Sequence, residues 1–443
     1  MPNEPEPSIV RIMEPVGEPV SGIWSDARQV ASAVFASARP ERLFLAWCCL
    51  ILTMLVGSLW DMSTPTTMPA SGATEPGETL PALFREYVEE FERPHGWDTD
   101  EVDGIEARQA FASAPQEVRD RVERLRRRDA FEFLLGGLSG GFEEIRLGVV
   151  GLRPAMIIDG IDTAFISNIG SLWRNDRGFL VIFGAVFLLF FSIFGGSIAR
   201  LDAERFTRDR DVSVLAVLRW AIQDWRRLYG GVLLPPVLAL LLLVPAGVLG
   251  LCAFIPGLDV LASLLWGVVL VGSFSAGLVI VAWLTSLPML CAGTACESGD
   301  PSEIVVRCAG LVRHRPGRYL CLIATAVIAG AIGWLLVSGV TTITLDAARS
   351  AGSMLGGPFS EAQSTAWPSL ASVSPGEMVE ESSGTRGLSV AILDGWRWLV
   401  VSVCTAWIIA FFAAAGGRIY LLQRRAVERL QIDELGTPGP EAG

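Results

Sequence analysis

Residues 179–199 read FLVIFGAVFLLFFSIFGGSIA, a run without a charged side chain. About 20 consecutive apolar residues are what an α-helix needs to cross the hydrocarbon core of a bilayer. Similar runs recur along the chain, so the sequence predicts an all-α integral membrane protein built on a six-helix transmembrane bundle. The expected spans are 43–60, 179–199, 231–252, a long run that follows the link 254–259 and ends near Met289, 319–343 and 396–422.

The segments between these spans define the expected organisation. Residues 1–42 form an N-terminal segment, in which the stretch from Gly22 to Pro40 has the apolar spacing of an amphipathic helix on a membrane surface. The other expected parts are a mostly helical loop domain at 61–177, a core at 178–343 that holds the second to fifth spans and two amphipathic connectors, a loosely ordered loop at 344–395, and a tail at 423–443.

Arginines are distributed unequally between the two sets of loops. The N-terminal segment, the connectors after the second and fourth spans and the tail carry four, seven, four and four arginines. The link after the third span carries none, and residues 345–394 carry two. Arginine-rich loops stay on the cytoplasmic side of a membrane. We therefore expect a multi-pass membrane protein with both termini cytoplasmic and both long loops outside.

The composition excludes several function classes. Of the 443 residues, 51% are hydrophobic and 19% are charged, and the net charge is −12. Nucleic acid is not an expected partner, because phosphate binding needs a basic face. All 35 basic residues are arginine, which excludes a Walker A loop and lysine-based catalysis.

No catalytic residue, cofactor site or metal site is expected. The histidines His95 and His314 stand alone, and no pair of the eight cysteines has zinc-site spacing with companion ligands. The spans carry charge only at their ends, so they offer no buried acid or base for a proton relay. These observations predict a protein that is not an enzyme.

Two connectors, 211–229 and 301–318, share a layout that suggests a weak internal duplication. Each has an acidic start, apolar residues at helical spacing and arginines before the next span. Helices of this kind lie in the cytoplasmic headgroup layer, where arginines attract anionic lipids. A docking surface for an unknown cytoplasmic or membrane protein partner is the alternative. The candidate contact residues are Arg219, Arg226, Arg227, Arg307, Arg313, Arg315 and Arg318.

Small residues within the spans indicate close contacts between helices. A glycine pair ends the second span, a small-xxx-small pair lies in the fifth, and alanines line one face of the sixth. Packing inside the bundle is expected, and an oligomer face is the alternative. The residues are Gly195, Gly196, Ala329, Gly333, Ala406, Ala410 and Ala414.

Several short motifs resemble those of a family of uncharacterised polytopic membrane proteins of planctomycete-type bacteria. The motifs are 194–200 (FGGSIAR) with Arg208-Asp209-Arg210, 288–290 (PML), 297–300 (ESGD), 315–320 (RPGRYL) and 419–435. The similarity covers roughly residues 20–60 and 178–435. The element from Glu297 to Arg318 is also similar to the membrane domain that accompanies some glycerophosphodiester phosphodiesterases. The resemblance implies a fold and a location in the bacterial plasma (inner) membrane, and it brings no activity.

The leading functional hypothesis is a non-catalytic membrane-organising or complex-assembly component. The alternative is a transporter or permease-like protein for a small molecule or a lipid. A conduit needs a continuous polar cavity lined by Ser273, Ser275, Thr341 or Ser402, whereas a packed bundle buries these side chains against backbone.

Overall fold

The chain is a multi-pass integral membrane protein, and its predicted all-α fold is confirmed. A computed structural model describes residues 22–64, 129–252, 258, 263–297, 299–353 and 385–428, and these contain helices and no strand. Six of the helices are long and apolar enough to cross a membrane. They are α3 (Pro40–Ser63), α10 (Arg177–Arg208), α12 (Trp225–Cys252), α14 (Trp266–Cys296), α16 (Pro316–Ser353) and α18 (Thr385–Glu428).

Most of these helices are longer than the apolar runs that revealed them. Helix α10 continues through the charged residues that follow the run, to Arg208, and α12 begins at Trp225. The expected loop at 344–395 is wrong at both of its described ends, because α16 continues to Ser353 and α18 begins at Thr385. Polar residues at these ends keep the helical backbone bonds of the adjoining span, which hydropathy alone does not reveal.

The short helices at the ends of the spans follow the sequence closely. The amphipathic N-terminal segment forms α1 (Ile23–Ala31) and α2 (Ala33–Ser37). The two connectors form α11 (Val214–Gln223) and α15 (Pro301–His314). In α15, Asp300 and Pro301 stand at the N-cap and the first helical position, where an acidic residue and a proline favour helix initiation.

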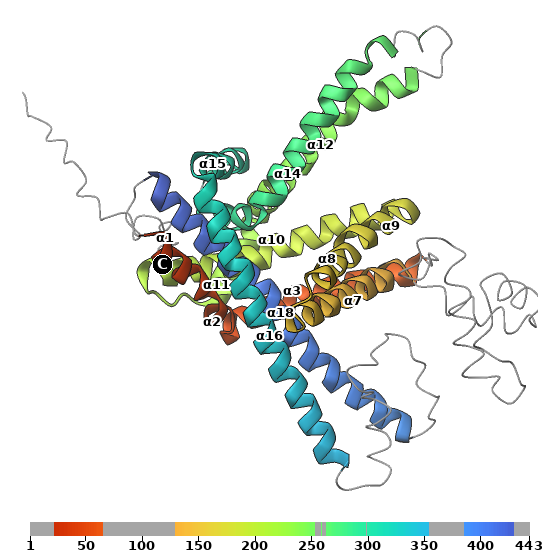
Figure 1. Cartoon of the computed structure of the whole chain (residues 1–443), viewed down its shortest axis with the longest axis vertical. Coiled ribbons are helices and arrows are strands. Elements are labelled where there is room, and N and C mark those ends of the chain that lie inside the picture. Colours follow the sequence, from red (N-terminus) through yellow and green to blue (C-terminus); the bar gives the residue numbers. More distant parts are fainter. Residues whose placement is uncertain are drawn as a thin grey trace, which may run out of the picture. The chain divides into compact units, whose positions relative to one another are not determined.

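Two compact units make up the structure (Figure 1). One comprises Met1–Cys49, Leu188–Thr344 and Trp398–Gly443, and we call it the connector unit because it holds α11 and α15. The other comprises Leu50–Phe187 and Leu345–Arg397, and we call it the hairpin unit. The hairpin unit contains α7 (Ala130–Val150), α8 (Pro154–Ile161), the π-helix η3 (Asp162–Ser167) and α9 (Asn168–Asn175).

Glycines bring the helices of the connector unit into close contact. A Cβ atom added to Gly416 of α18 would lie 2.3 Å from the carbonyl oxygen of Pro288 in α14. At Gly231 of α12 it would lie 2.3 Å from a methyl carbon of Thr294 in α14. The core around these contacts includes the fully buried Met289 and Tyr420. The close packing therefore draws α12, α14 and α18 together near the ends of the spans.

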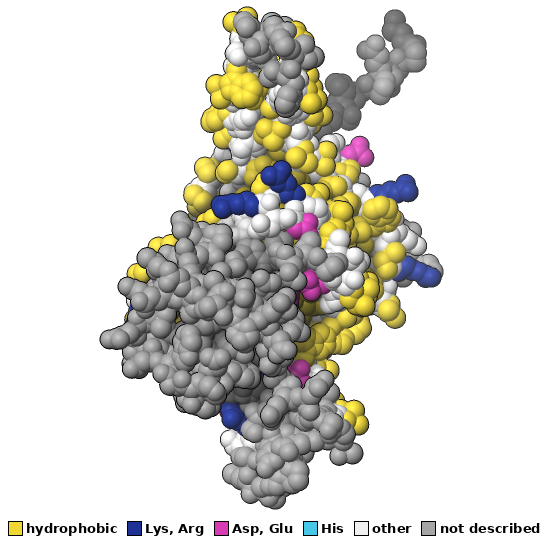
Figure 2. Space-filling model, turned by 90° about the vertical axis from the view of Figure 1, so that its right-hand side faces the viewer, with side chains coloured by type: hydrophobic (Ala, Val, Ile, Leu, Met, Phe, Trp, Pro, Cys, Tyr) yellow, Lys and Arg dark blue, Asp and Glu magenta, His cyan; other side chains and the backbone are white. Residues whose placement is uncertain are grey.

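Large apolar side chains cover the outside of the spans. On α12, Leu240 and Leu241 are 65% and 64% exposed, and on α14 Val271 and Phe274 are 67% and 69% exposed. Apolar side chains dominate the described part of the face in Figure 2, and charged side chains appear there as separate spots. Patches of this extent are unusual on proteins that face water, and they suit helices whose solvent is lipid.

Candidate functional site

Buried carboxylates lie where the arginine-rich connectors meet the spans of the connector unit. Asp202 of α10, Asp26 of α1 and Glu297, which follows α14, are 1%, 0% and 8% exposed. An ionised carboxylate is stable in such a place only when cations and hydrogen-bond donors surround it. Each of the three has an arginine partner.

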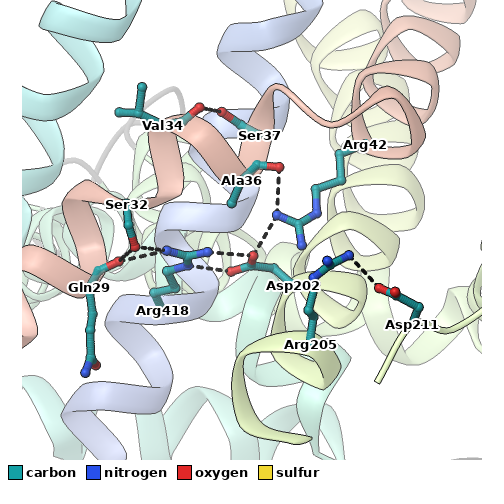
Figure 3. A network of polar contacts seen from close by, with 10 residues as sticks. All are labelled: Gln29, Ser32, Val34, Ala36, Ser37, Arg42, Asp202, Arg205, Asp211 and Arg418. Carbon is teal, nitrogen blue, oxygen red and sulfur yellow. Dashed lines mark hydrogen bonds and ion pairs between the residues drawn. The ribbon is translucent and has the colours of Figure 1, made fainter. Parts of the chain in front are cut away.

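Asp202 is held between arginines of two other spans (Figure 3). Its Oδ1 lies 2.7 Å from Nη1 of Arg42 in α3. Its Oδ1 and Oδ2 also accept hydrogen bonds from Nη2 and Nε of Arg418 in α18, at 3.1 and 2.8 Å. This two-point arginine–carboxylate geometry is the strongest and most directional form of an ion pair.

The same two arginines hold the N-terminal helices. Nη1 of Arg418 donates to the carbonyl oxygen of Gln29 at 2.8 Å and to Ser32 Oγ. Nη1 of Arg42 donates to the carbonyl oxygen of Ala36 at 2.8 Å (Figure 3). The Asp202 cluster therefore joins α1 and α2 to the ends of α3, α10 and α18.

A further ion pair fixes the start of α1. Arg318, at the beginning of α16, donates to the carboxylate of the fully buried Asp26. Together with the bonds from Arg418, this contact anchors the N-terminal segment at both α16 and α18. One face of the amphipathic segment is therefore packed against the connector unit. Trp24 and Phe35 of the segment are 85% and 79% exposed.

Glu297 is the centre of a second cluster. Its carboxylate accepts a hydrogen bond from the Tyr420 hydroxyl and one of 2.6 Å from Nη1 of Arg307 in α15. Nη1 of Arg424 in α18 lies 3.3 Å from it. Arg424 also donates to Glu428 at 2.8 Å. The side-chain amide of Gln423, beside this cluster, donates to the carbonyls of Leu311 and Arg315 at 3.1 Å each, which satisfies the end of α15.

Burial raises the pKa of the Glu297 carboxyl above its ordinary value of 4.5. Arg424 and Arg307 oppose this rise, and the nearby Glu428 adds to it. The balance arises because removal from water disfavours the charged form by more than the two arginines favour it. Glu297 therefore takes up a proton more readily than an exposed glutamate.

The structure divides the seven arginines predicted as contact residues into two groups. Arg307, Arg318 and Arg227 are bound internally: the first two pair with Glu297 and Asp26, and Arg227 pairs with Asp224 at 3.2 Å. The other group is Arg219, Arg226, Arg313 and Arg315, none of which has an ion pair with any residue in the described part of the chain. The first three of these side chains are exposed, and Arg315 is half-buried.

Helix α11 presents arginine and apolar side chains together. Arg219 is exposed on the same helix as Leu215 and Ile222, which are 76% and 55% exposed, whereas Val217 and Ala221 are buried. Nearby, the buried Arg200 of α10 stacks on Trp220 of α11 at 3.9 Å from the ring centroid. A helix that is anchored on one side and exposes leucine, isoleucine and arginine on the other suits the headgroup layer of a membrane.

The predicted packing residues lie inside the connector unit. Ala406, Ala410 and Ala414 of α18 are fully buried, and Ala329 of α16 is 8% exposed. The three glycines of the set also lie against neighbouring side chains. A Cβ on Gly333 would lie 2.4 Å from the Trp407 ring, one on Gly196 would lie 3.4 Å from Leu228, and Gly195 is buried beside the Phe191 ring.

The polar residues of the proposed conduit do not converge. Ser402 of α18 is bonded to the Trp47 indole at 2.9 Å and donates to the carbonyl of Leu399. Thr341 of α16 is half-buried, near Cys404 of α18. Ser273 is exposed on the outside of α14. Ser402 is therefore occupied by contacts between and within helices, and no hydrogen bond joins it to Thr341 or Ser273 in the described part of the chain.

The sequence indicated the arginines of this site more fully than its carboxylates. Asp202 was read as a charge at the end of a span, since it follows Arg200 in a polar stretch. Glu297 is close in sequence to the connector arginines, which predicts that some of them are paired internally, and the pair with Arg307 confirms this. A sequence signal did exist, because Asp202 and Glu297 follow glycine-containing apolar runs and Arg418 and Arg424 follow another such run. His95 and Asp259 lie outside the described residues. Within the described residues, no group of three or more potential metal ligands lies within reach of one another.

No family model, no curated protein and no solved structure matches the chain. The resemblance to the planctomycete-type membrane family therefore stays a prediction. What the site can do is inferred from its own chemistry.

Proposed function

We propose that the protein is a non-catalytic membrane-organising component whose arginine-rich face binds anionic lipid headgroups. The observation that carries the proposal is the division of the connector arginines into an internally paired group and an exposed group. The paired arginines hold the ends of the spans in place. The exposed arginines, Arg219, Arg226 and Arg313, remain available to phosphate.

Charge and position support contact with lipid. Each of these arginines near an anionic surface contributes about 1 kcal/mol to attraction, so three contribute about 3 kcal/mol together. The apolar side chains of Leu215 and Ile222 on α11 and of Val306 on α15 are exposed and add area that prefers the acyl boundary. We place this face on the cytoplasmic side because that is where arginine-rich loops and anionic lipids occur together.

The packing inside the connector unit argues against the transporter alternative. A passage would need polar side chains that line a common space, and Ser402 is instead bonded to Trp47 and to the backbone of its own helix. The buried charges form closed clusters at the helix ends, with every carboxylate bound by an arginine. They stabilise an assembly rather than offer a free proton carrier.

The test uses the full chain in nanodiscs of phosphatidylcholine alone or mixed with phosphatidylglycerol. Amide exchange across α11 and α15 is measured for the natural chain and for a variant with Arg219→Gln, Arg226→Gln and Arg313→Gln. We expect slower exchange in the anionic nanodiscs for the natural chain, and loss of that difference in the variant, because the exposed guanidinium groups supply the attraction.

The matched control removes three arginines from outside the two connectors, with the changes Arg174→Gln, Arg177→Gln and Arg349→Gln. This control should keep the difference between the two lipids. Equal exchange of the natural chain in both lipids would overturn the proposed function. Equal loss in variant and control would assign the effect to net charge alone and would also contradict it.

A further inference from the structure

The hairpin unit contains a packed pair of helical arms that expose many large apolar side chains, although α7 is not among the six apolar helices found as spans. Helix α7 forms one arm, and α8, η3 and α9 form the other. The two arms lie side by side (Figure 1). The sequence was interpreted as placing this stretch in an outward-facing domain.

Glycines hold the arms at backbone distance. A Cβ on Gly141 would lie 2.5 Å from the carbonyl oxygen of Gly160, and one on Gly160 would lie 2.6 Å from that of Gly141. Gly137 meets the side chain of Asn168, which donates to the carbonyl oxygen of Leu134 at 3.0 Å. Helices in lipid usually associate by close approach at small residues four positions apart, supported by side-chain hydrogen bonds across the interface. Gly137, Gly141 and the Asn168 side chain provide both features here.

The base of the hairpin is bonded to the ends of two spans. The Asp61 carboxylate of α3 accepts hydrogen bonds from the backbone N–H groups of Phe131 and Glu132, at 3.0 and 3.2 Å, and so caps α7. The Phe131 ring packs on Gly57 of α3 and on Phe183 of α10. Because Phe131 lies beside Gly57 and Asp61, α7 starts where α3 ends.

Further contacts show that α7 turns back along α3. The core at the base includes Met54 of α3 together with Leu134 and Leu135 of α7. A residue before Gly57 in α3 and residues after Phe131 in α7 thus belong to one core, as expected for antiparallel neighbours. Helix α7 has 21 residues, a length of about 31 Å, which matches the hydrocarbon thickness of a bilayer.

Some charged side chains of the hairpin are bonded within it, whereas Glu132, Asp159 and Arg174 are exposed. Arg146 pairs with Glu143, Thr163 donates to Glu144 at 3.3 Å, and Ser167 donates to Asp162 at 2.6 Å. Internal pairing of this kind is what charged groups require at membrane depth. The paired groups lie in the half of the hairpin nearer its turn, where the exposed Arg153 also lies.

The turn keeps an apolar side chain where glycine would be favoured. Leu152 has φ 51° and follows α7 at the position that a glycine occupies in many helix ends. The N–H of Arg153 donates to the carbonyl oxygen of Gly148 at 2.8 Å, which completes the Schellman pattern. The Leu152 side chain is 88% exposed, and Val150 and Ile158 beside it are 67% and 66% exposed.

We infer that residues 130–175 form a hairpin inserted in the bilayer beside α3 and α10, with its turn in the headgroup layer on the side where α3 begins. The occupant of its apolar outside is lipid, because that surface continues the lipid-facing surface of the two spans to which its base is bonded. The two arms cross the bilayer in opposite directions. They therefore leave every other segment on the side of the membrane predicted from the six spans.

The first test is photo-crosslinking to lipid. A diazirine analogue of leucine is placed at position 158 or 166 of the full chain, in nanodiscs of phosphatidylcholine and phosphatidylglycerol. The reference positions are 241, which is exposed on the span α12, and 210, in the polar stretch after α10. We expect lipid adducts at 158 and 166 in the yield found at 241. Yields as low as at 210 would overturn the inference.

The second test locates the turn. A membrane-impermeant maleimide is applied from each side of the membrane to Leu152→Cys and to His314→Cys, with the natural chain as background. The inference requires that Leu152→Cys is labelled from the same side as His314→Cys. Labelling of Leu152→Cys from the opposite side, or from neither side, would contradict the crossing. Both measurements are independent of the headgroup contacts proposed for α11 and α15.

Discussion

Asp202 and Glu297 are both buried acids that follow the apolar part of a span and bind two arginines. The net charges of the two clusters are opposite. Asp202 is one carboxylate between two arginines, whose remaining donors reach backbone carbonyls and Ser32. Glu297 shares its two arginines with further carboxylates: Arg307 also approaches Glu303 and Glu428, at 3.8 and 3.9 Å. The first cluster has an excess of positive charge and the second an excess of negative charge.

Helix α18 stabilises the ends of two neighbouring spans, α10 and α14. Arg418 and Arg424 are less than two turns apart on α18, and each binds the acid of a different neighbouring span. The Asp202 cluster is a fixed ion pair that also ties down α1 and α2. The Glu297 cluster is the titratable one, because its cations are shared. The predictions below test this difference.

Asp202→Asn should have the largest effect, since it leaves Arg42 and Arg418 buried without a counter-ion. Removal of one partner from a buried ion pair lowers the free energy of unfolding by about 3–5 kcal/mol. Denaturant or thermal unfolding in mild detergent measures it. The control is Asp211→Asn, whose carboxylate is 75% exposed in its pair with Arg205 and should change stability by about 0.5 kcal/mol. Similar losses in the two variants would refute the special role of Asp202.

Gly416→Ala should destabilise the packing of α18 on α14 near Glu297. The added methyl group would meet the Pro288 carbonyl oxygen, and overpacking of this kind lowers stability by about 1–3 kcal/mol. Gly277→Ala is the control, because nothing lies within 4 Å of a Cβ there. Unfolding under the same conditions should show the control to be as stable as the natural chain or more so. If Gly416→Ala behaves like the control, the close contact is not required.

Tyr420→Phe should have a smaller effect. It removes the hydroxyl that donates to Glu297 and leaves Arg307 and Arg424 in place. Loss of one hydrogen bond to a charged group that keeps its other partners lowers the unfolding free energy by about 1 kcal/mol. A loss as large as that of Asp202→Asn would mean that the tyrosine, rather than the arginines, holds the carboxylate.

The smallest expected effect is a dependence on pH from Glu297. Because its pKa is raised in the folded chain, protonation favours the folded state. This contribution is fully present below the unfolded value near 4.5 and is lost as the pH rises through the folded pKa. The difference in unfolding free energy between the natural chain and Glu297→Gln should therefore grow in favour of the natural chain as the pH is lowered from 7. A difference that is constant with pH would contradict the titration.

The six spans could be predicted because hydropathy over about 20 residues is a local property of the sequence. The helices of the N-terminal segment and of the connectors could be predicted from apolar spacing, and in α15 also from Asp300 and Pro301. The extension of α16 and α18 into the expected loop could not, because polar residues continue a helix once an adjoining span has formed it.

The pairing between residues far apart in sequence could not be predicted either. Asp202 and Arg418 are far apart in sequence, and Asp26 and Arg318 likewise, so only the packing of the spans brings them together. The distribution of arginines among the loops predicts the side of the membrane on which they lie. Whether a given arginine binds a buried acid or is exposed depends on how the spans pack. Arg318 and Arg313 illustrate this, since five residues separate a paired side chain from an exposed one.

The central claim is that paired arginines hold the helix ends and exposed arginines bind lipid. The most direct test counts the phosphatidylglycerol molecules that remain with the detergent-purified protein, alongside its unfolding free energy. The variant lacking Arg219, Arg226 and Arg313 should retain fewer anionic lipids with unchanged stability. Asp202→Asn should lose stability yet, while folded, retain as many as the natural chain. Unchanged lipid retention in the arginine variant, or a loss of stability equal to that of Asp202→Asn, would contradict the claim.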